Sequence, residues 1–259
     1  MPHLDRDGVR LYYEEAGSGS PPLVLIHGWT CDHTFLQPQF EHFRRSHRVI
    51  SLDLRGHGRS DKPEQVYSMS AFADDVAWLC AQLKVERPVV VGHSMGGVIA
   101  LVLAAGHPRL AAAIASLDST ILPTAQVEAM VRPLLEAMRG PDGAAVQRQF
   151  LGDMMFIAAD DPVRKERIIE IMCGTPRHVM LSAFDNLFFG FDHAGAAAGC
   201  TVPWLALYAQ DVHSDVARLR QLCPTLTVGQ TVGAGHFLQL EVPQQVNPMI
   251  ERFLRISAL

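Results

Sequence analysis

The chain has 259 residues, of which 48% are hydrophobic and 19% charged, and its formal net charge is −5 at pH 7. This length allows a large buried core in one α/β domain. The acidic balance, without a cluster of lysines and arginines, excludes nucleic acid from the expected partners. The charged N-terminus and the lack of a membrane-length apolar run predict neither a signal peptide nor a membrane span, so we expect a cytoplasmic protein without a membrane partner.

The cysteines are few and scattered. They are Cys31, Cys80, Cys173, Cys200 and Cys223. Their number is odd and no two form a C-x-x-C pair, so the sequence predicts neither a disulfide framework nor a zinc site. We expect buried thiols, no metal and no cofactor.

Short apolar runs alternate with longer segments of helical periodicity, which is typical of parallel βαβ units. The expected strands cover residues 9–14, 23–27, 49–53, 89–92, 114–118, 203–208 and 227–232. Phe72, Val76 and Leu79 repeat at helical spacing after Ser70, which is a candidate N-cap. Residues 98–105 are apolar on every side, which predicts a helix buried against the sheet.

Between residues 123 and 190 the pattern is helical throughout and contains no expected strand. Pro133 interrupts the first of these helices and should kink it or begin a second one. We therefore expect a helical cap at 123–190, inserted into one core domain formed by 1–122 and 191–259. Methionine and phenylalanine are concentrated in the cap, and Phe184 and Phe188 are predicted to bind an apolar or aromatic part of a substrate.

The chain carries a Gly-x-Ser-x-Gly motif directly after an apolar strand and before a helix of small residues. The segment reads Val-Val-Val-Gly-His-Ser-Met-Gly-Gly from Val89 to Gly97. A serine on a tight strand-to-helix turn needs glycines beside it, because side chains there would collide with the backbone. The motif predicts that Ser94 is a nucleophile.

Three further segments occur in a fixed order around this motif. They are His27-Gly28-Trp29 at the end of the second expected strand, residues 54–60 after the third, and Gly233-Ala234-Gly235-His236-Phe237 near the C-terminus. With the serine motif, these segments resemble the α/β-hydrolase family over nearly the whole chain. The resemblance implies a mostly parallel central sheet flanked by helices, with a helical cap inserted after the strand that ends at Asp118.

The resemblance also implies roles for individual residues. His236 matches the position of the general base, and the backbone N–H groups of Trp29 and Met95 match the oxyanion hole. His27 and His93 lie within family motifs, at positions that shape turns and line the substrate pocket.

The acid that orients the histidine has two candidates. Alignment with the family's usual pattern places Val212 at the acid position, so the sequence departs from that pattern. Asp211 could serve if the turn is one residue shorter. Asp118 could reach the imidazole from the carboxyl end of the neighbouring strand, and we favour it. Asp215 has a different expected role, at the start of a helix over 216–222.

The leading functional prediction is a serine hydrolase that cleaves a small-molecule carboxylic ester or lactone with an apolar or aromatic group through an acyl-enzyme. A C–C bond hydrolase or perhydrolase would use the same residues. A cofactor-independent ring-cleaving dioxygenase is another alternative, because residues 28–33 and 208–210 resemble that group. From a different class, the fold could serve as a ligand-binding receptor with residual hydrolysis. The exact substrate and the oligomeric state stay open.

Overall fold

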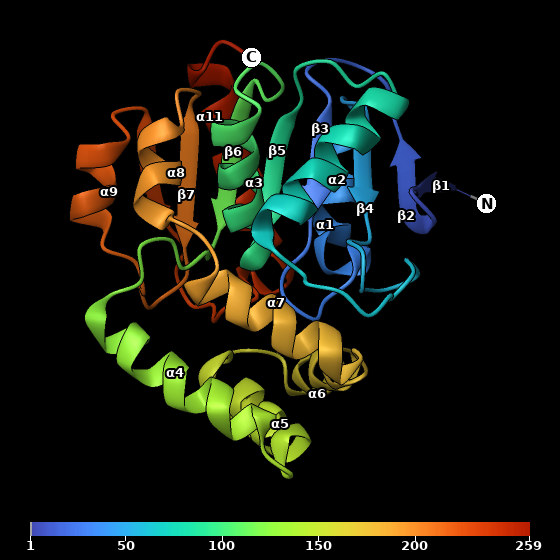
Figure 1. The fold of residues 1–259 in the computed structure, drawn as a ribbon. Coiled ribbons are helices and arrows are strands. Elements are labelled where there is room, and N and C mark those ends of the chain that lie inside the picture. The colour runs from blue at the N-terminus through green and yellow to red at the C-terminus, as the bar shows by residue number, and fades with distance from the viewer. Residues whose placement is uncertain (1) are drawn as a thin grey trace.

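The structure is a computed structural model that describes residues 2–259. Within this range the strands form one eight-stranded sheet in the order β1-β2-β4-β3-β5-β6-β7-β8 (Figure 1). The strands are β1 (His3–Arg6), β2 (Val9–Ala16), β3 (Leu23–Ile26), β4 (Val49–Leu52), β5 (Val89–His93), β6 (Ala113–Leu117), β7 (Trp204–Tyr208) and β8 (Leu226–Gln230). β1 and β2 pair antiparallel, and the strands from β4 to β8 in this order run parallel. The sheet confirms the predicted fold class.

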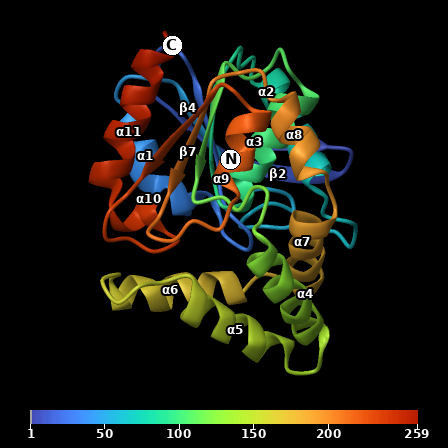
Figure 2. The ribbon, with the colours of Figure 1, turned by 90° about the vertical axis from the view of Figure 1, so that its left-hand side faces the viewer.

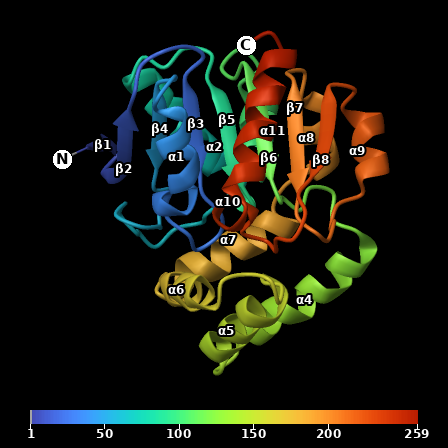
Figure 3. The same ribbon diagram turned by 180° about the vertical axis from the view of Figure 1, so that it is seen from behind.

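Helices cover both faces of the sheet, so the central strands are buried on both sides. On one face lie α2 (Met69–Gln82), α3 (Met95–Gly106), α8 (His193–Gly199) and α9 (Val216–Leu222). On the other face lie the 3-10 turn η1 (His33–Leu36), α1 (Gln37–Phe43), α10 (Leu238–Glu241) and α11 (Pro243–Ile256) (Figure 3). Most residues of α3 are buried, as its uniformly apolar sequence predicts.

The seven predicted strands all occur, with ends shifted by at most a few residues. The structure adds β1, which the sequence analysis did not predict because its four residues, His-Leu-Asp-Arg, are mostly polar. β1 pairs with β2 at the sheet edge, where His3 lies opposite Tyr12. An edge strand needs less apolar character than a buried one, so its sequence signal is weak.

Two helix starts show what local sequence can and cannot locate. The N-cap of α2 is Ser68, not the predicted Ser70, and the Ser68 hydroxyl accepts a hydrogen bond from the Ala71 N–H at 3.1 Å. Asp215 caps α9 as expected, accepting from the Arg218 N–H at 2.9 Å.

Four helices lie together beyond the ends of the strands, on the side where β5 and β6 end (Figures 1 and 2). They are α4 (Ala125–Arg139), α5 (Gly143–Met154), α6 (Pro162–Cys173) and α7 (Arg177–Phe189). α4 continues through Pro133 as one helix, so of the two expected outcomes, a kink or a second helix, the second does not occur. Packing of Val131 and Leu135 in the core beside α5 and α7 holds the helix on both sides of the proline. We refer to these four helices as the helical cap; the domain boundaries at 123 and 190 stay a prediction.

Within residues 2–259, none of the helices has both the length and the apolar character needed to cross a bilayer.

Candidate active site

Ser94 lies at the junction of β5 and α3 with φ 53° and ψ −118°, a conformation that costs a non-glycine residue energy. The turn is tight. A Cβ atom on Gly92 would lie 2.1 Å from the carbonyl oxygen of Gly96, and one on Gly96 would lie 2.2 Å from that of Ile26. The Ser94 N–H donates to the Leu117 carbonyl at 2.8 Å. These contacts require glycine on both sides of the serine and hold Ser94 at the wall of a cavity.

The imidazole of His236 contacts Asp118, with 2.6 Å between His236 Nδ1 and Asp118 Oδ2. The other carboxylate oxygen of Asp118 accepts from the Ala209 N–H at 2.8 Å. Asp118 directly follows β6, and its own N–H donates to the Leu207 carbonyl at 2.7 Å. With Nδ1–H donating to Asp118, the Nε2 atom of His236 is left to accept a proton. His236 and Ser94 line the same cavity.

The structure separates the two acid candidates by position. Asp118 is buried and bonded to His236, whereas Asp211 is an exposed residue at the rim of the cavity. Val212, at the position expected for the acid, is also exposed. Of the two carboxylates, Asp118 is the one that the fold brings to the imidazole.

The predicted oxyanion-hole residues lie beside the serine. A Cβ on Gly28 would lie 3.1 Å from Ser94 Cβ, so the loop after β3 passes directly over the turn that carries Ser94. Within residues 2–259 the backbone N–H groups of Trp29 and Met95 donate to no other protein group. The Trp29 side chain is held separately, because its Nε1–H donates to the Met180 carbonyl in α7 at 2.9 Å. Both backbone donors are therefore available to a ligand.

His27 and His93 are fully buried and lie outside the cavity lining, at odds with their expected contact with substrate. His27 accepts from the Leu54 N–H at 3.0 Å, and His93 donates to the His236 carbonyl at 2.9 Å. Burial lowers the pKa of each below its usual value, so both imidazoles are neutral supports for neighbouring loops. The sequence motif identified their place in the fold but not the direction of their side chains.

The cavity has a volume of about 250 Å³ and lies between the core and the helical cap. Phe184 and Phe188 of α7 line it, and their ring centroids are 5.1 Å apart. Trp29 packs against Phe184 at 4.9 Å. Further apolar lining comes from Val98, Val127, Met130, Val131, Phe150, Met154, Met155, Phe156, Ile157 and Leu187. An apolar or aromatic group fits this lining.

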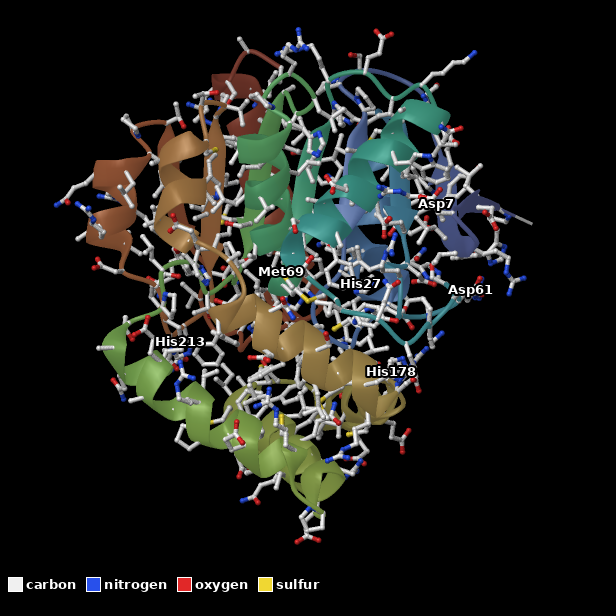
Figure 4. All side chains as sticks on the ribbon, in the orientation of Figure 1. Asp7, His27, Asp61, Met69, His178 and His213 are labelled. Atoms are coloured by element: carbon white, nitrogen blue, oxygen red, sulfur yellow. The ribbon has the colours of Figure 1, made fainter. Side chains whose placement is uncertain are left out.

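The polar part of the lining carries acidic side chains. It includes Thr120, Asp153, Gln210, Asp211 and His213. Figure 4 shows His213 beside the start of α4, where the cap meets the core. Among residues 2–259, the side chains that line the cavity include no lysine or arginine. Nothing in the sequence pointed to His213 at this site, because a loop position gives no signal before the fold places it at the cavity; Gln210 lay in a segment singled out only for its resemblance to ring-cleaving dioxygenases.

Among the described residues there is no cluster of three or more histidine, cysteine or acidic side chains that could hold a metal ion.

Comparison with known proteins agrees with this fold. A family profile described as the alpha/beta hydrolase fold matches residues 21–155, about half of the chain. The AB hydrolase superfamily protein YisY of Bacillus subtilis is 35% identical over 125 residues, which cover 48% of this chain and 44% of YisY. The chain spans less than half the length of the first curated relatives that it matches.

Several solved structures match nearly the full length of the chain. A thermophilic esterase from Thermogutta terrifontis superposes with a TM-score of 0.85 at 26% identity, covering 98% of this chain and 97% of that one. Est816, described as an N-acyl homoserine lactone degrading enzyme, gives 0.83 at 28% identity, covering 97% and 100%. The fold, the serine turn and the profile match agree with the predicted resemblance, and the chain belongs to the alpha/beta hydrolase fold family.

Proposed function

We propose that this chain is a serine hydrolase that cleaves a carboxylic ester or lactone with an apolar or aromatic group. The observation that carries the proposal is the arrangement of Ser94, His236 and Asp118, with the serine and the histidine on one apolar cavity. The similarity to an esterase and to a lactone-degrading enzyme supports the same chemistry.

In the proposed reaction Ser94 Oγ attacks the substrate carbonyl carbon while His236 Nε2 takes the hydroxyl proton. The N–H groups of Trp29 and Met95 stabilise the negative charge on the carbonyl oxygen; losing one such donor raises the barrier by about 3 kcal/mol. The histidine then gives its proton to the departing alkoxide. A water molecule, activated by the same imidazole, releases the acid and restores Ser94.

Asp118 has a supporting role in this scheme. Its Oδ2 keeps the proton of His236 on Nδ1 and stabilises the imidazolium that forms during attack. Its Oδ1 is bonded to the Ala209 N–H, so the carboxylate cannot turn away without losing a second hydrogen bond.

The charge of the lining refines the substrate class. Asp153 and Asp211 add negative charge at the rim, and the lining side chains in residues 2–259 supply no lysine or arginine to pair with a carboxylate. A substrate that carries its own carboxylate would be repelled, because like charges across a low-dielectric cleft disfavour binding. We therefore propose a neutral ester or lactone.

Active-site labelling tests the proposal. A fluorophosphonate probe should add one label to the protein, and the protein should hydrolyse p-nitrophenyl esters of apolar acids. Ser94→Ala should abolish both, whereas Ser70→Ala, which removes an exposed hydroxyl from α2, should change neither. Labelling that persists in Ser94→Ala would contradict the proposal.

One observation also supports a second candidate function. The paired His236 and Asp118, with the acid after β6, are also the dyad that a cofactor-independent ring-cleaving dioxygenase would use. Such an enzyme would consume oxygen with an N-heteroaromatic substrate, and its turnover would survive Ser94→Ala. Oxygen uptake measured on wild type and on this variant separates the two functions.

A further inference from the structure

The loop between α5 and α6, residues 155–161, lies against the loop that carries the histidine, residues 233–237. We call them the cap loop and the histidine loop. Asp160 of the cap loop is 7% exposed. Its Oδ1 accepts from the Gly235 N–H at 3.2 Å and its Oδ2 from the Ile157 N–H at 2.8 Å. One buried carboxylate thus joins the helical cap to the residue before His236.

A second bond joins the same two loops. The His236 N–H donates to the Met155 carbonyl of the cap loop at 3.0 Å. The rings of Phe156 and Phe237 pack beside this bond with 5.2 Å between centroids. The cap loop therefore holds two consecutive backbone N–H groups, those of Gly235 and His236.

The side chains that follow the histidine loop extend this contact. Glu241 of α10 is nearly buried and pairs with Arg164 of α6 at 2.6 Å. On the core side, the His236 carbonyl accepts from His93. The backbone of His236 is thus held between the core, through His93, and the helical cap.

The two loops leave no room for a side chain at Gly235. A Cβ there would lie 2.5 Å from Asp160 Oδ2, 3.0 Å from the Met155 oxygen and 3.1 Å from the Ile157 nitrogen. The histidine loop begins at Gly233 with φ 72°, and a segment with two glycines has little rigidity of its own. Its conformation therefore depends on the groups that bind it from outside.

We propose that Asp160 is a positioning residue for His236. Through Asp160, the helical cap holds the catalytic base in position, in addition to covering the substrate. The carboxylate fixes the Gly235 N–H, which fixes the start of the His236 backbone and keeps the imidazole on Asp118. The role in turnover rests on the proposed hydrolase function. Movement of the cap away from the core would break the contacts that hold the backbone of Gly235 and His236. Hydrolysis therefore proceeds only when the cap is packed against the core.

Asp→Asn substitutions at two adjacent positions, together with Asp160→Ala, test this proposal. Asp160→Asn keeps one acceptor oxygen but turns an NH₂ group toward the other backbone N–H, so kcat should fall about tenfold, and Asp160→Ala should lower it about 10²-fold, the scale of a 1 Å misplacement. KM for a p-nitrophenyl ester should change by no more than about threefold, because Asp160 does not line the cavity. Asp161→Asn is the control. Asp161 is the adjacent carboxylate and is exposed, and among residues 2–259 it accepts only from the N–H groups of Val163 and Arg164 of α6.

A spectroscopic readout separates positioning from turnover. The proton between His236 Nδ1 and Asp118 should give a low-field proton resonance in the wild type, which His236→Gln removes. Asp160→Asn and Asp160→Ala should shift or broaden this resonance, and Asp161→Asn should leave it unchanged. Gly235→Ala places a methyl group of the histidine loop against the cap loop and should have the same effect on the resonance. The effect of Gly235→Ala combined with Asp160→Ala should be smaller than the sum of the two single effects.

The outcomes are distinct. If the wild type hydrolyses no ester, the proposed function fails, while the resonance still decides the positioning of His236. If kcat and the resonance of the Asp160 variants match those of Asp161→Asn, Asp160 has no positioning role. If Asp160→Ala does not fold, Asp160→Asn and Gly235→Ala give the same decision.

Discussion

At the scale of single residues, the candidate site depends on the Asp118 carboxylate, whose two oxygens bond to His236 and to the Ala209 N–H. Asp211 lies on the same cavity but is exposed and has no contact with the imidazole among those that the structure describes. The two aspartates should therefore respond differently to the same substitution.

Asp118→Asn should lower kcat by up to about 10⁴-fold, because an amide at this position disturbs the tautomer of His236 and cannot stabilise its cation. Asp211→Asn should lower kcat by less than about tenfold, since a rim charge acts only at a distance. Steady-state rates on one activated ester measure both. A collapse in Asp211→Asn with Asp118→Asn nearly intact would reverse the assignment.

The rim carboxylates predict a preference for uncharged substrates. Neutral p-nitrophenyl butyrate should be hydrolysed with a kcat/KM about tenfold or more above that of p-nitrophenyl hemisuccinate, which carries a carboxylate. The double variant Asp153→Asn, Asp211→Asn should narrow this ratio, and added salt should narrow it in the wild type. If the ratio of the two kcat/KM values stays the same in the double variant and at high salt, the rim carboxylates have no effect on the choice of substrate.

At the scale of elements, the start of α2 shows how a helix end is fixed. Ser68 has extended backbone angles and caps the Ala71 N–H, whereas Ser70 lies inside the first turn. Ser68→Ala should lower the free energy of unfolding by about 1 kcal/mol, and Ser70→Ala should change it by only a few tenths. Urea denaturation of the two variants measures the difference. Equal losses would mean that the cap bond contributes nothing to stability.

At the scale of the whole molecule, several histidines are buried in neutral form. Burial lowers the pKa of His27 and His93 and that of His57 to about 3. Below pH 6.5 the unfolded chain takes up protons at these positions that the folded chain does not. The free energy of unfolding should therefore fall as the pH falls below 6.5, by up to about 1.4 kcal/mol per pH unit for each imidazole that stays neutral in the folded chain.

Urea denaturation at a series of pH values from about 7.5 to about 5.5 checks this prediction, because this interval spans the usual pKa of histidine. His57→Gln removes one titrating group and should reduce the slope by about 1.4 kcal/mol per pH unit. A stability that stays level over this range would show that these imidazoles become protonated in the folded state.

The sequence by itself determined the order of the strands from β2 to β8, the place of the turn at Ser94 and the family. These depend on local patterns: an apolar run of β-branched residues makes a buried strand, and two glycines around Ser94 permit a turn that no other residue fits. The same patterns placed His236 after the last strand, by its position in a motif.

Only the tertiary structure decided which groups meet around that histidine. Asp118 and His236 are 118 residues apart, and Asp160 and Gly235 are 75 residues apart, so no periodicity or spacing connects them. The same holds for His27 and His93, whose motif position is local but whose burial depends on the loops packed over them. A strand or a turn is encoded by residues that are neighbours in sequence, whereas a contact between distant segments, such as that of Asp118 with His236, exists only once the chain has folded.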